Sequence, residues 1–358
     1  MPDFATEKML TVIVPVYRVD LSWLDECFKS ILTQTFTDYE LIIVNDGAPD
    51  DVGAFIDAYD FGNVPVQIIK QKNMGVAAAR NAGIDAAGGR YVTFIDSDDT
   101  IEKECFAQIT DYAEKNCLEV LMWGIYREYK NKREEFSPYL ADIMHFDRKQ
   151  KEEVQLKCLV GILPFYVCPP ASSDAAGSAC AKLYRLDLLN RWKLRYTPGL
   201  KRAEDMEFNL RVLDKAEDIG YLYRFLYHYR QNEASATYVY RDRGIDVFTD
   251  SLEAIRKHIV KAGKSDLFVQ VYYMRCLFFY LESMDVDYLN PQNPKPFGER
   301  IRQLGEQAMR QPYATAFANL KGDHLTFARK IPLFFIRHKM FTMLALFFKG
   351  YRMFRKQS

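Results

Sequence analysis

The sequence predicts an α/β protein in which helices cover both faces of a mostly parallel sheet and a helical region follows at the C-terminal end. Two observations support this prediction. In the first 125 residues, short apolar runs rich in β-branched residues alternate with segments whose apolar residues recur at helical spacing. From Gly244 onward, helical spacing alone recurs. Strands that are apolar along their whole length are typical of parallel sheets buried under helices.

Each expected element follows from a local pattern. Helical spacing predicts helices in LSWLDECFKSILTQ, after the first strand, and in GVAAARNAGIDAAGG, after the third. Residues 161–180 are rich in Pro, Gly and Ser, which indicates a loop, whereas residues 204–216 have a helical pattern. Residues 267–284 are apolar on nearly every side, so we expect a helix buried among others. The expected strands are Leu10–Val16, Glu40–Asp46, Val66–Lys70, Arg90–Asp96 and Leu118–Gly124.

Composition excludes several classes of protein. Hydrophobic residues make up 49% and charged residues 27% of the 358 positions, which is typical of a globular rather than a disordered chain. The 48 basic and 48 acidic residues balance, so nucleic acid is not the expected partner. The seven cysteines form no CxxC pair, which indicates reduced thiols in the cytoplasm. We expect neither a signal peptide nor a membrane-spanning helix.

The basic residues are unevenly distributed. Residues 329–358 hold eight Lys or Arg and no Asp or Glu, whereas the first 328 residues hold 40 basic and 48 acidic groups. This basic tail (residues 329–358) is also rich in Phe and Leu. Two interpretations stay open: the tail binds an anionic bilayer, or it packs its apolar side on the preceding helices. The first would place a cytoplasmic protein peripherally on the inner face of the plasma membrane.

Carboxylates gather where the fourth strand ends, in FIDSDDT. In parallel sheets, ligands bind beyond the carboxyl ends of the strands, which is where Asp96, Asp98 and Asp99 lie. Clustered carboxylates resist ionisation unless a cation joins them, and oxygen ligands select Mg²⁺ or Mn²⁺. A turn that caps the following helix is the competing interpretation.

Three other features have both a functional and a structural interpretation. The pair Glu204-Asp205 could supply a general base, or it could complement the dipole at a helix start. Arg80 could reach a diphosphate, although an arginine that faces solvent is commoner. His228 is either a phosphate or sugar contact or a packing residue.

Neither GxxxxGK[ST] nor a GxGxxG after a strand is present, which excludes a P-loop and a dinucleotide fingerprint.

With these motifs in place, residues 9–125 resemble the glycosyltransferases of family 2, which have the GT-A fold. The stretches that carry the resemblance are TVIVPVYRVDLSWLDECFKSILTQTFTDYELIIVNDGAPDD and NMGVAAARNAGIDAAGGRYVTFIDSDD. KLYR, AED and YHYRQNEASAT look like acceptor-side elements of bacterial surface-polysaccharide transferases. The resemblance implies three parts: residues 1–125 bind the nucleotide sugar, residues 126–240 form the acceptor side, and residues 241–358 are a helical region.

The resemblance also implies a reaction and its residues. A sugar would pass from a UDP-sugar, with inversion, to a hydroxyl of a glycan or lipid-linked acceptor in surface polysaccharide synthesis. Asp96 and Asp98 match the DxD motif, with Asp98 the ligand of Mn²⁺ or Mg²⁺ and Asp99 adjacent to it. Asp205 matches the catalytic base, and Glu204 lies beside it. The residues implied to contact the donor are Pro15, Val16, Tyr17, Asp46 (on the uracil imide), Arg80 and Asp96.

Two alternative functions stay open. A non-catalytic subunit that binds nucleotide sugars would not need both the DxD motif and the Glu204-Asp205 pair. A sugar-1-phosphate nucleotidyltransferase would need a glycine-rich N-terminal loop, and VPVYRVDLS has no glycine. Transfer of a sugar requires a cation for the leaving diphosphate and a base for the acceptor hydroxyl, and the two carboxylate groups meet that requirement.

Overall fold

The computed structural model describes residues 8–160, 174–231, 240, 242–325 and 327–355. The described residues up to Gln231 belong to one compact unit, and those from residue 240 onward belong to a second. Most of the loop expected at residues 161–180, and the end of the YHYRQNEASAT motif, lie outside the described residues. Within that expected loop, Asp174–Gly177 form one helical turn, α6.

The first unit contains a nine-stranded sheet with the order β3-β2-β1-β4-β8-β6-β9-β5, and β7 pairs with β6. All five expected strands are present: β1 Leu10–Val16, β2 Tyr39–Asp46, β3 Val66–Gln71, β4 Tyr91–Phe94 and β6 Val120–Tyr129. Four more join them: β5 Thr100–Ile101, β7 Lys132–Phe136, β8 Lys182–Arg185 and β9 Ile219–Arg230. The pairs among β1 to β4 and the pair β6–β9 are parallel, whereas β5, β7 and β8 pair antiparallel.

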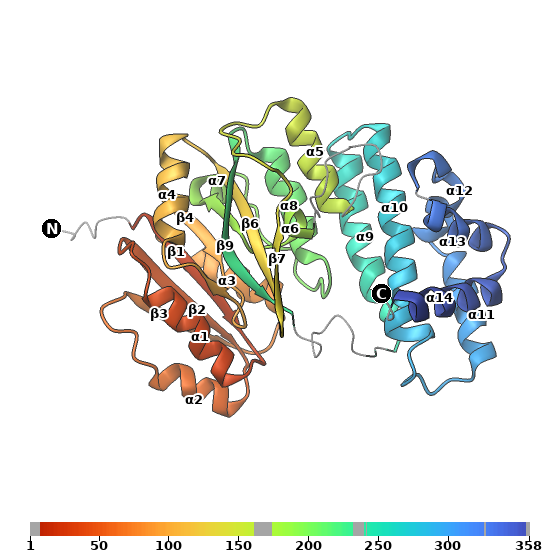
Figure 1. The fold of residues 1–358 in the computed structure, drawn as a ribbon, viewed down its shortest axis with the longest axis horizontal. Helices are drawn as coiled ribbons and strands as arrows, with labels where there is room; N and C mark the ends of the chain where they lie inside the picture. Colours follow the sequence, from red (N-terminus) through yellow and green to blue (C-terminus); the bar gives the residue numbers. More distant parts are fainter. Residues whose placement is uncertain (1–7, 161–173, 232–239, 241, 326, 356–358) are drawn as a thin grey trace. The chain divides into compact units, whose positions relative to one another are not determined.

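Helices cover both faces of this sheet, as the sequence predicts (Figure 1). Along β1, Val12 and Val14 belong to one core and Ile13 to the other, because successive side chains of a strand point to opposite faces. The helices that pack on the Val12 face are α1 Leu21–Leu32, α2 Asp50–Ala58 and α4 Cys105–Lys115. Those on the Ile13 face are α3 Val76–Ala86, α5 Arg148–Leu159, α7 Leu186–Arg191 and α8 Glu204–Lys215.

The parallel strands bring their carboxyl ends to one edge of the sheet. Val16 of β1 pairs with Asn45 of β2, and Asp46 of β2 pairs with Gln71 of β3. β4 runs beside β1 and ends at Phe94, two residues before the first carboxylate of the FIDSDDT motif. This edge is the expected ligand edge of an open α/β sheet.

The second unit is helical, as expected from residue 244 onward. Its helices are α9 Gly244–Lys261, α10 Asp266–Ser283, α11 Phe297–Ala308, α12 Tyr313–Asn319, α13 Phe327–Arg337 and α14 Phe341–Arg355. The predicted all-round apolar helix is α10, which packs against α9 and α12. Phe279 of α10 stacks on Phe248, and the hydroxyl of Tyr280 donates to the carbonyl of Leu304 at 2.8 Å.

The described part of the basic tail lies mostly in α13 and α14, and its two sides differ. Leu333, Ile336 and Leu344 are buried in the helical unit, which supports the packing interpretation for that side. Phe334 and Leu346 are more than half exposed. None of the helices in the described parts of the chain is both long enough and apolar enough to cross a bilayer. The six cysteines among the described residues are free, in agreement with their spacing.

Candidate active site

The turn after β4 is held by two residues of β9 that lie about 130 positions later in the chain. The hydroxyl of Tyr227 accepts from the Asp96 amide at 3.1 Å and donates to Asp99 Oδ2 at 2.7 Å. The amide of Arg230 donates to Asp99 Oδ1 at 2.8 Å. Asp99 is only 1% exposed, and each of its oxygens has a partner inside the protein. Its contacts are those of a residue that fixes the turn.

Asp98 and Asp96 are the more accessible carboxylates of this turn. Burial, followed by the neighbouring Asp96, raises the pKa of Asp98 to about 6, although Arg230 acts in the opposite direction. The Arg230 guanidinium donates to the carbonyl of Asp98 at 2.9 Å and forms an ion pair with Glu26. A carboxylate whose ionisation is resisted in this way gains from a bound cation.

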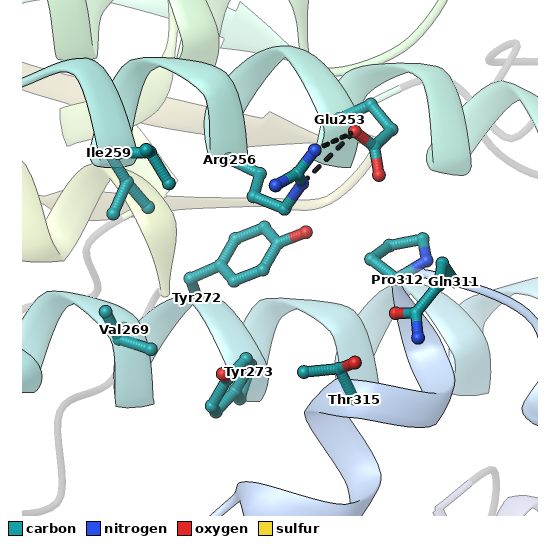
Figure 2. Close-up of a pocket in the computed structure, with 10 residues that line it drawn as sticks. Glu253, Arg256, Ile259, Val269, Tyr272, Tyr273, Gln311, Pro312 and Thr315 are labelled. Carbon is teal, nitrogen blue, oxygen red and sulfur yellow. Dashed lines mark hydrogen bonds and ion pairs between the residues drawn. The ribbon is translucent and has the colours of Figure 1, made fainter.

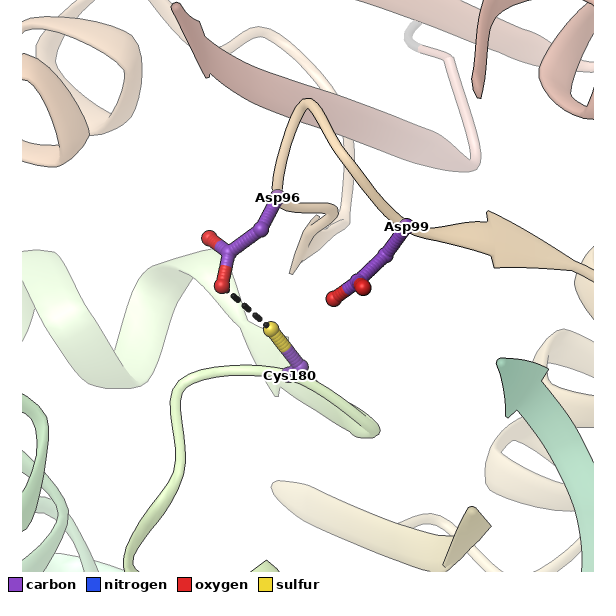
Figure 3. Close-up of side chains that lie close together, drawn as sticks. All are labelled: Asp96, Asp99 and Cys180. Carbon is purple, nitrogen blue, oxygen red and sulfur yellow. Dashed lines mark hydrogen bonds between the residues drawn. The ribbon is translucent and has the colours of Figure 1, made fainter. Parts of the chain in front are cut away.

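A cysteine that the sequence analysis did not select completes this cluster. Asp96, Asp99 and Cys180 each offer an atom within 4.8 Å of the others (Figure 3). The Cys180 thiol donates to Asp96 Oδ2 at 3.2 Å. Burial, with Asp96 and Asp99, raises the pKa of this thiol well above its ordinary value, so the sulfur stays protonated. Because a thiol is a poor ligand for Mg²⁺ or Mn²⁺, Cys180 acts here as a hydrogen-bond donor to Asp96.

Arg80 joins the turn to the second carboxylate pair. Its Nη2 lies 3.0 Å from Asp96 Oδ1, and its Nη1 lies 3.2 Å from Glu204 Oε1. The side chain is buried, with 4% exposure, and lies over the ring of Tyr196. The commoner arrangement, an arginine facing solvent, is therefore wrong for this residue.

The small residues of α3 explain this burial. A Cβ at Gly83 would come within 2.4 Å of the Ile13 side chain, so α3 lies close against β1. Arg80 belongs to this closely packed helix, and its side chain is buried. Arg80 Nε has no hydrogen-bond partner among the described residues, which leaves one donor of the guanidinium unused.

Glu204 and Asp205 begin α8 after a strained residue. Ala203 has a φ of +54°, a left-handed conformation that is uncommon for residues other than glycine. Burial and the adjacent Asp205 raise the pKa of Glu204 to about 7, although Arg80 acts in the opposite direction. Burial also raises the pKa of Asp205. A carboxylate that titrates near neutral pH suits general-base catalysis. The structure thus brings this pair to the carboxylate turn, which spacing alone does not establish.

The residues implied to bind the nucleotide lie at the same edge. Pro15 and Val16 are buried in β1, so their side chains belong to the core, whereas Tyr17 is 37% exposed. Asp46 is buried and accepts from the amides of Met74 at 2.9 Å and Gly75 at 2.8 Å. Its carboxylate therefore fixes the turn that leads into α3.

His228 has the contacts of a packing residue. Its Nδ1 lies 2.7 Å from Glu128 and its Nε2 lies 3.0 Å from Glu102. The ring also stacks on Tyr126. Both ring nitrogens thus interact within the protein, which favours the structural interpretation of this histidine over a sugar contact.

Four residues near the carboxylates are not indicated individually by the sequence, although three of them lie in the motifs KLYR and YHYRQNEASAT. Lys182 is fully buried on β8, where burial lowers its pKa to about 8, and its Nζ donates to the carbonyl of Ser178 at 2.6 Å. The others are Cys180, Tyr227 and Arg230. The partners of these last three residues are distant in the sequence, so no local pattern indicates them. The sequence signals were the motif KLYR, which begins with Lys182, and the motif YHYRQ, which contains Tyr227 and Arg230.

One family model and several known glycosyltransferases are similar to this chain in sequence. Residues 11–169 match the family model for glycosyl transferase family 2. The chain is 29% identical over 346 residues to the uncharacterized glycosyltransferase EpsJ of Bacillus subtilis, covering 95% of this chain and 96% of that protein. It is 30% identical over 250 residues to the glycosyltransferase GlyA of Streptococcus pneumoniae, covering 69% of this chain but 34% of that protein.

A solved structure shares the fold along almost the whole chain. The S. aureus TarS 1-349 structure in complex with UDP-GlcNAc has a TM-score of 0.65 and 20% identity. The similarity covers 96% of this chain and 92% of the TarS chain. It confirms the predicted combination of an α/β sheet domain and C-terminal helices.

Proposed function

The chain is a glycosyltransferase of family 2, and we propose that it transfers a sugar from a UDP-linked donor to a hydroxyl group with inversion, assisted by a divalent cation. The observation that carries this proposal is the bridge formed by Arg80, which holds Asp96 at 3.0 Å and Glu204 at 3.2 Å. A group suited to the donor phosphates and a group suited to the acceptor hydroxyl thus belong to one site. The UDP-GlcNAc bound to TarS supports a UDP-sugar as the donor.

The carboxylate turn fits a hard divalent cation. Asp98 and Asp96 offer oxygen atoms, and the nearby thiol is held protonated. The raised pKa of Asp98 means that the protein leaves its negative charge incompletely balanced. Mn²⁺ or Mg²⁺ held by Asp98 would act as a Lewis acid that stabilises the diphosphate leaving group. Arg80 would help to orient the donor indirectly, by holding Asp96 in the turn.

Asp205 is the proposed base, with Glu204 as its neighbour. Its carboxylate removes the proton of the acceptor hydroxyl as the oxygen attacks the anomeric carbon. The new C–O bond forms while the bond to the diphosphate oxygen breaks on the opposite face, which inverts the configuration. Glu204 keeps Arg80 in place through the 3.2 Å contact, and burial raises the proton affinity of Asp205.

Turnover of UDP-sugars tests this proposal. We expect UDP release from at least one of UDP-glucose, UDP-galactose and UDP-GlcNAc, and we expect the release to require Mn²⁺ or Mg²⁺. UDP with Mn²⁺ at about 100 times its Kd should stabilise the fold by about 2.7 kcal/mol. A rise in melting temperature without any turnover would instead support a non-catalytic subunit. Formation of UDP-sugar from UTP and a sugar-1-phosphate would support a nucleotidyltransferase.

The acceptor is proposed to be a glycan or a lipid-linked glycan of surface polysaccharide synthesis. An acceptor attached to lipid would give the exposed side of the basic tail a function at an anionic membrane. That side combines apolar and basic residues, and acidic residues are absent from residues 329–358. Its exposed members include Lys330, Phe334, Lys339, Met343 and Leu346. Such surfaces bind anionic bilayers through apolar insertion and charge attraction.

Vesicle binding tests the membrane partner. The double variant Lys330→Gln/Lys339→Gln should bind phosphatidylglycerol vesicles roughly 30-fold more weakly, because each basic residue contributes about 1 kcal/mol. Co-sedimentation at low salt measures this effect. The matched control is Lys257→Gln/Lys261→Gln, which removes two exposed lysines of α9. Deletion of the tail is a poorer test, because it would also remove the buried Leu333 and Ile336. Wild-type protein that ignores these vesicles would contradict the membrane proposal.

A further inference from the structure

A cavity of about 450 Å³ lies within the helical unit, and none of its lining residues is assigned to the candidate active site. α9, α10 and the start of α12 line it (Figure 2). Its volume is within the range of small-molecule binding sites, about 300–1,000 Å³. The lining residues that can make polar contacts are Glu253, Arg256, Tyr272, Tyr273, Gln311 and Thr315.

The charged residues of this cavity neutralise each other. Arg256 donates to Glu253 Oε2 through Nη2 at 3.0 Å and through Nε at 3.2 Å. Both side chains belong to α9, three residues apart, so the pair forms within one helix. A cavity with balanced charge favours neither a phosphate nor a cation. It still offers hydrogen-bond donors and acceptors to an uncharged polar ligand.

Tyr272 supplies a buried polar group in the wall of the cavity. The side chain is 3% exposed, and its hydroxyl has no nitrogen or oxygen partner among the described residues. A weak interaction with the thiol of Cys276, one turn further along α10, is its remaining contact. Figure 2 shows this hydroxyl directed toward the space between Glu253 and Pro312. A buried hydroxyl with so weak a partner gains from a ligand that can hydrogen-bond to it.

We propose that this cavity binds one uncharged sugar unit of a glycan chain, and this inference rests on the proposed function as a glycan-extending enzyme. A sugar ring has an apolar C–H face, which suits the rings of Tyr272 and Tyr273, and a rim of hydroxyl groups. Those hydroxyls would pair with the Arg256–Glu253 pair, with Gln311 and with Thr315. An acyl chain fits less well, because it would cover the Tyr272 hydroxyl without bonding to it. The cavity is thus a glycan-binding subsite separate from the reaction centre.

Saturation-transfer NMR on the full-length chain tests this site directly. The probes are chitotriose and maltotriose, two neutral linear trisaccharides, each added without UDP or metal. At least one should show saturation transfer to its ring protons. Thr315→Trp fills the cavity from an exposed position and should weaken that binding by at least tenfold. Arg256→Gln should weaken it as well, whereas the matched control Lys257→Gln, one residue along the same helix, should leave it unchanged.

Two results would overturn the subsite. The first is the absence of binding for both trisaccharides, including the case in which decanoate binds instead. The second is equal binding by wild type and by a Thr315→Trp variant that melts at the wild-type temperature. If Thr315→Trp does not fold, unchanged trisaccharide binding by Arg256→Gln would overturn the subsite instead. The proposed function fails separately, because trisaccharide binding without any UDP-sugar turnover would contradict the transfer reaction and leave the subsite in place.

Discussion

Asp205→Asn is expected to lower sugar transfer by roughly 10²–10⁴-fold while UDP affinity stays close to that of the wild type. The amide has the shape of the carboxylate but cannot accept the proton of the acceptor hydroxyl. The described hydrogen bond of the Asp205 side chain comes from the Met206 amide, at 2.8 Å. No described hydrogen bond joins it to the carboxylate turn or to Asp46, so the variant should not disturb the residues proposed to bind UDP. Transfer rates and UDP calorimetry on the same preparation separate chemistry from donor binding.

The pH dependence of transfer provides the control for this variant. The base acts in its ionised form, and burial raises the pKa of both members of the pair, that of Glu204 to about 7. Wild-type kcat/KM should therefore rise with pH over a range that lies above the ordinary titration range of an aspartate, and level off once Asp205 is ionised. The residual rate of Asp205→Asn should lack that rise. Transfer within a few-fold of wild type would move the base elsewhere, and Glu204→Gln would then be the next variant to measure.

Local sequence patterns predicted the parallel half of the sheet because its signals are local. Each of β1, β2, β3 and β4 is an apolar run closed by turn residues, and the observed bounds differ from the expected ones by at most two residues. β8 is different. It enters between β4 and β6 from about 90 residues later in the chain, and its four residues, KLYR, carry too short a pattern to identify a strand. The two-residue β5 carries even less.

The candidate active site also combines features that local sequence patterns indicate with contacts between distant parts of the chain. Asp98 and Asp99 are adjacent in the sequence, and nothing in FIDSDDT indicates that one is buried and the other accessible. In the structure, Tyr227 and Arg230 of β9 bind both oxygens of Asp99 and bury it, while Asp98 keeps the more accessible position. Arg80 is a second example, because its burial depends on α3 packing tightly on β1 and on Glu204, 124 positions away. Such contacts depend on tertiary packing, which a single sequence does not reveal.

Asp98→Ala is expected to abolish metal-dependent binding of UDP. In the proposed site this carboxylate holds the cation that contacts the diphosphate, so its loss removes a direct ligand. Loss of an outer-shell partner alone costs roughly 10–100-fold in metal affinity, and the loss of a direct ligand should exceed that range. Calorimetry of UDP binding in the presence and absence of Mn²⁺ measures the effect. We expect the wild-type enhancement by Mn²⁺ to disappear in the variant.

Misfolding can be distinguished from loss of the metal ligand in this variant. Because burial and Asp96 raise the pKa of Asp98 to about 6, ionisation of Asp98 opposes folding above that pH. Removing the carboxylate should therefore leave the metal-free melting temperature at pH 7.5 equal to or above that of the wild type. Asp51→Ala, an exposed acidic residue in the first turn of α2, is the matched control and should keep the Mn²⁺ enhancement. A normally folded Asp98→Ala variant that binds UDP as tightly as wild type in Mn²⁺ would exclude Asp98 as the ligand. Asp96, which shares the turn and contacts Arg80, would then be the carboxylate to test.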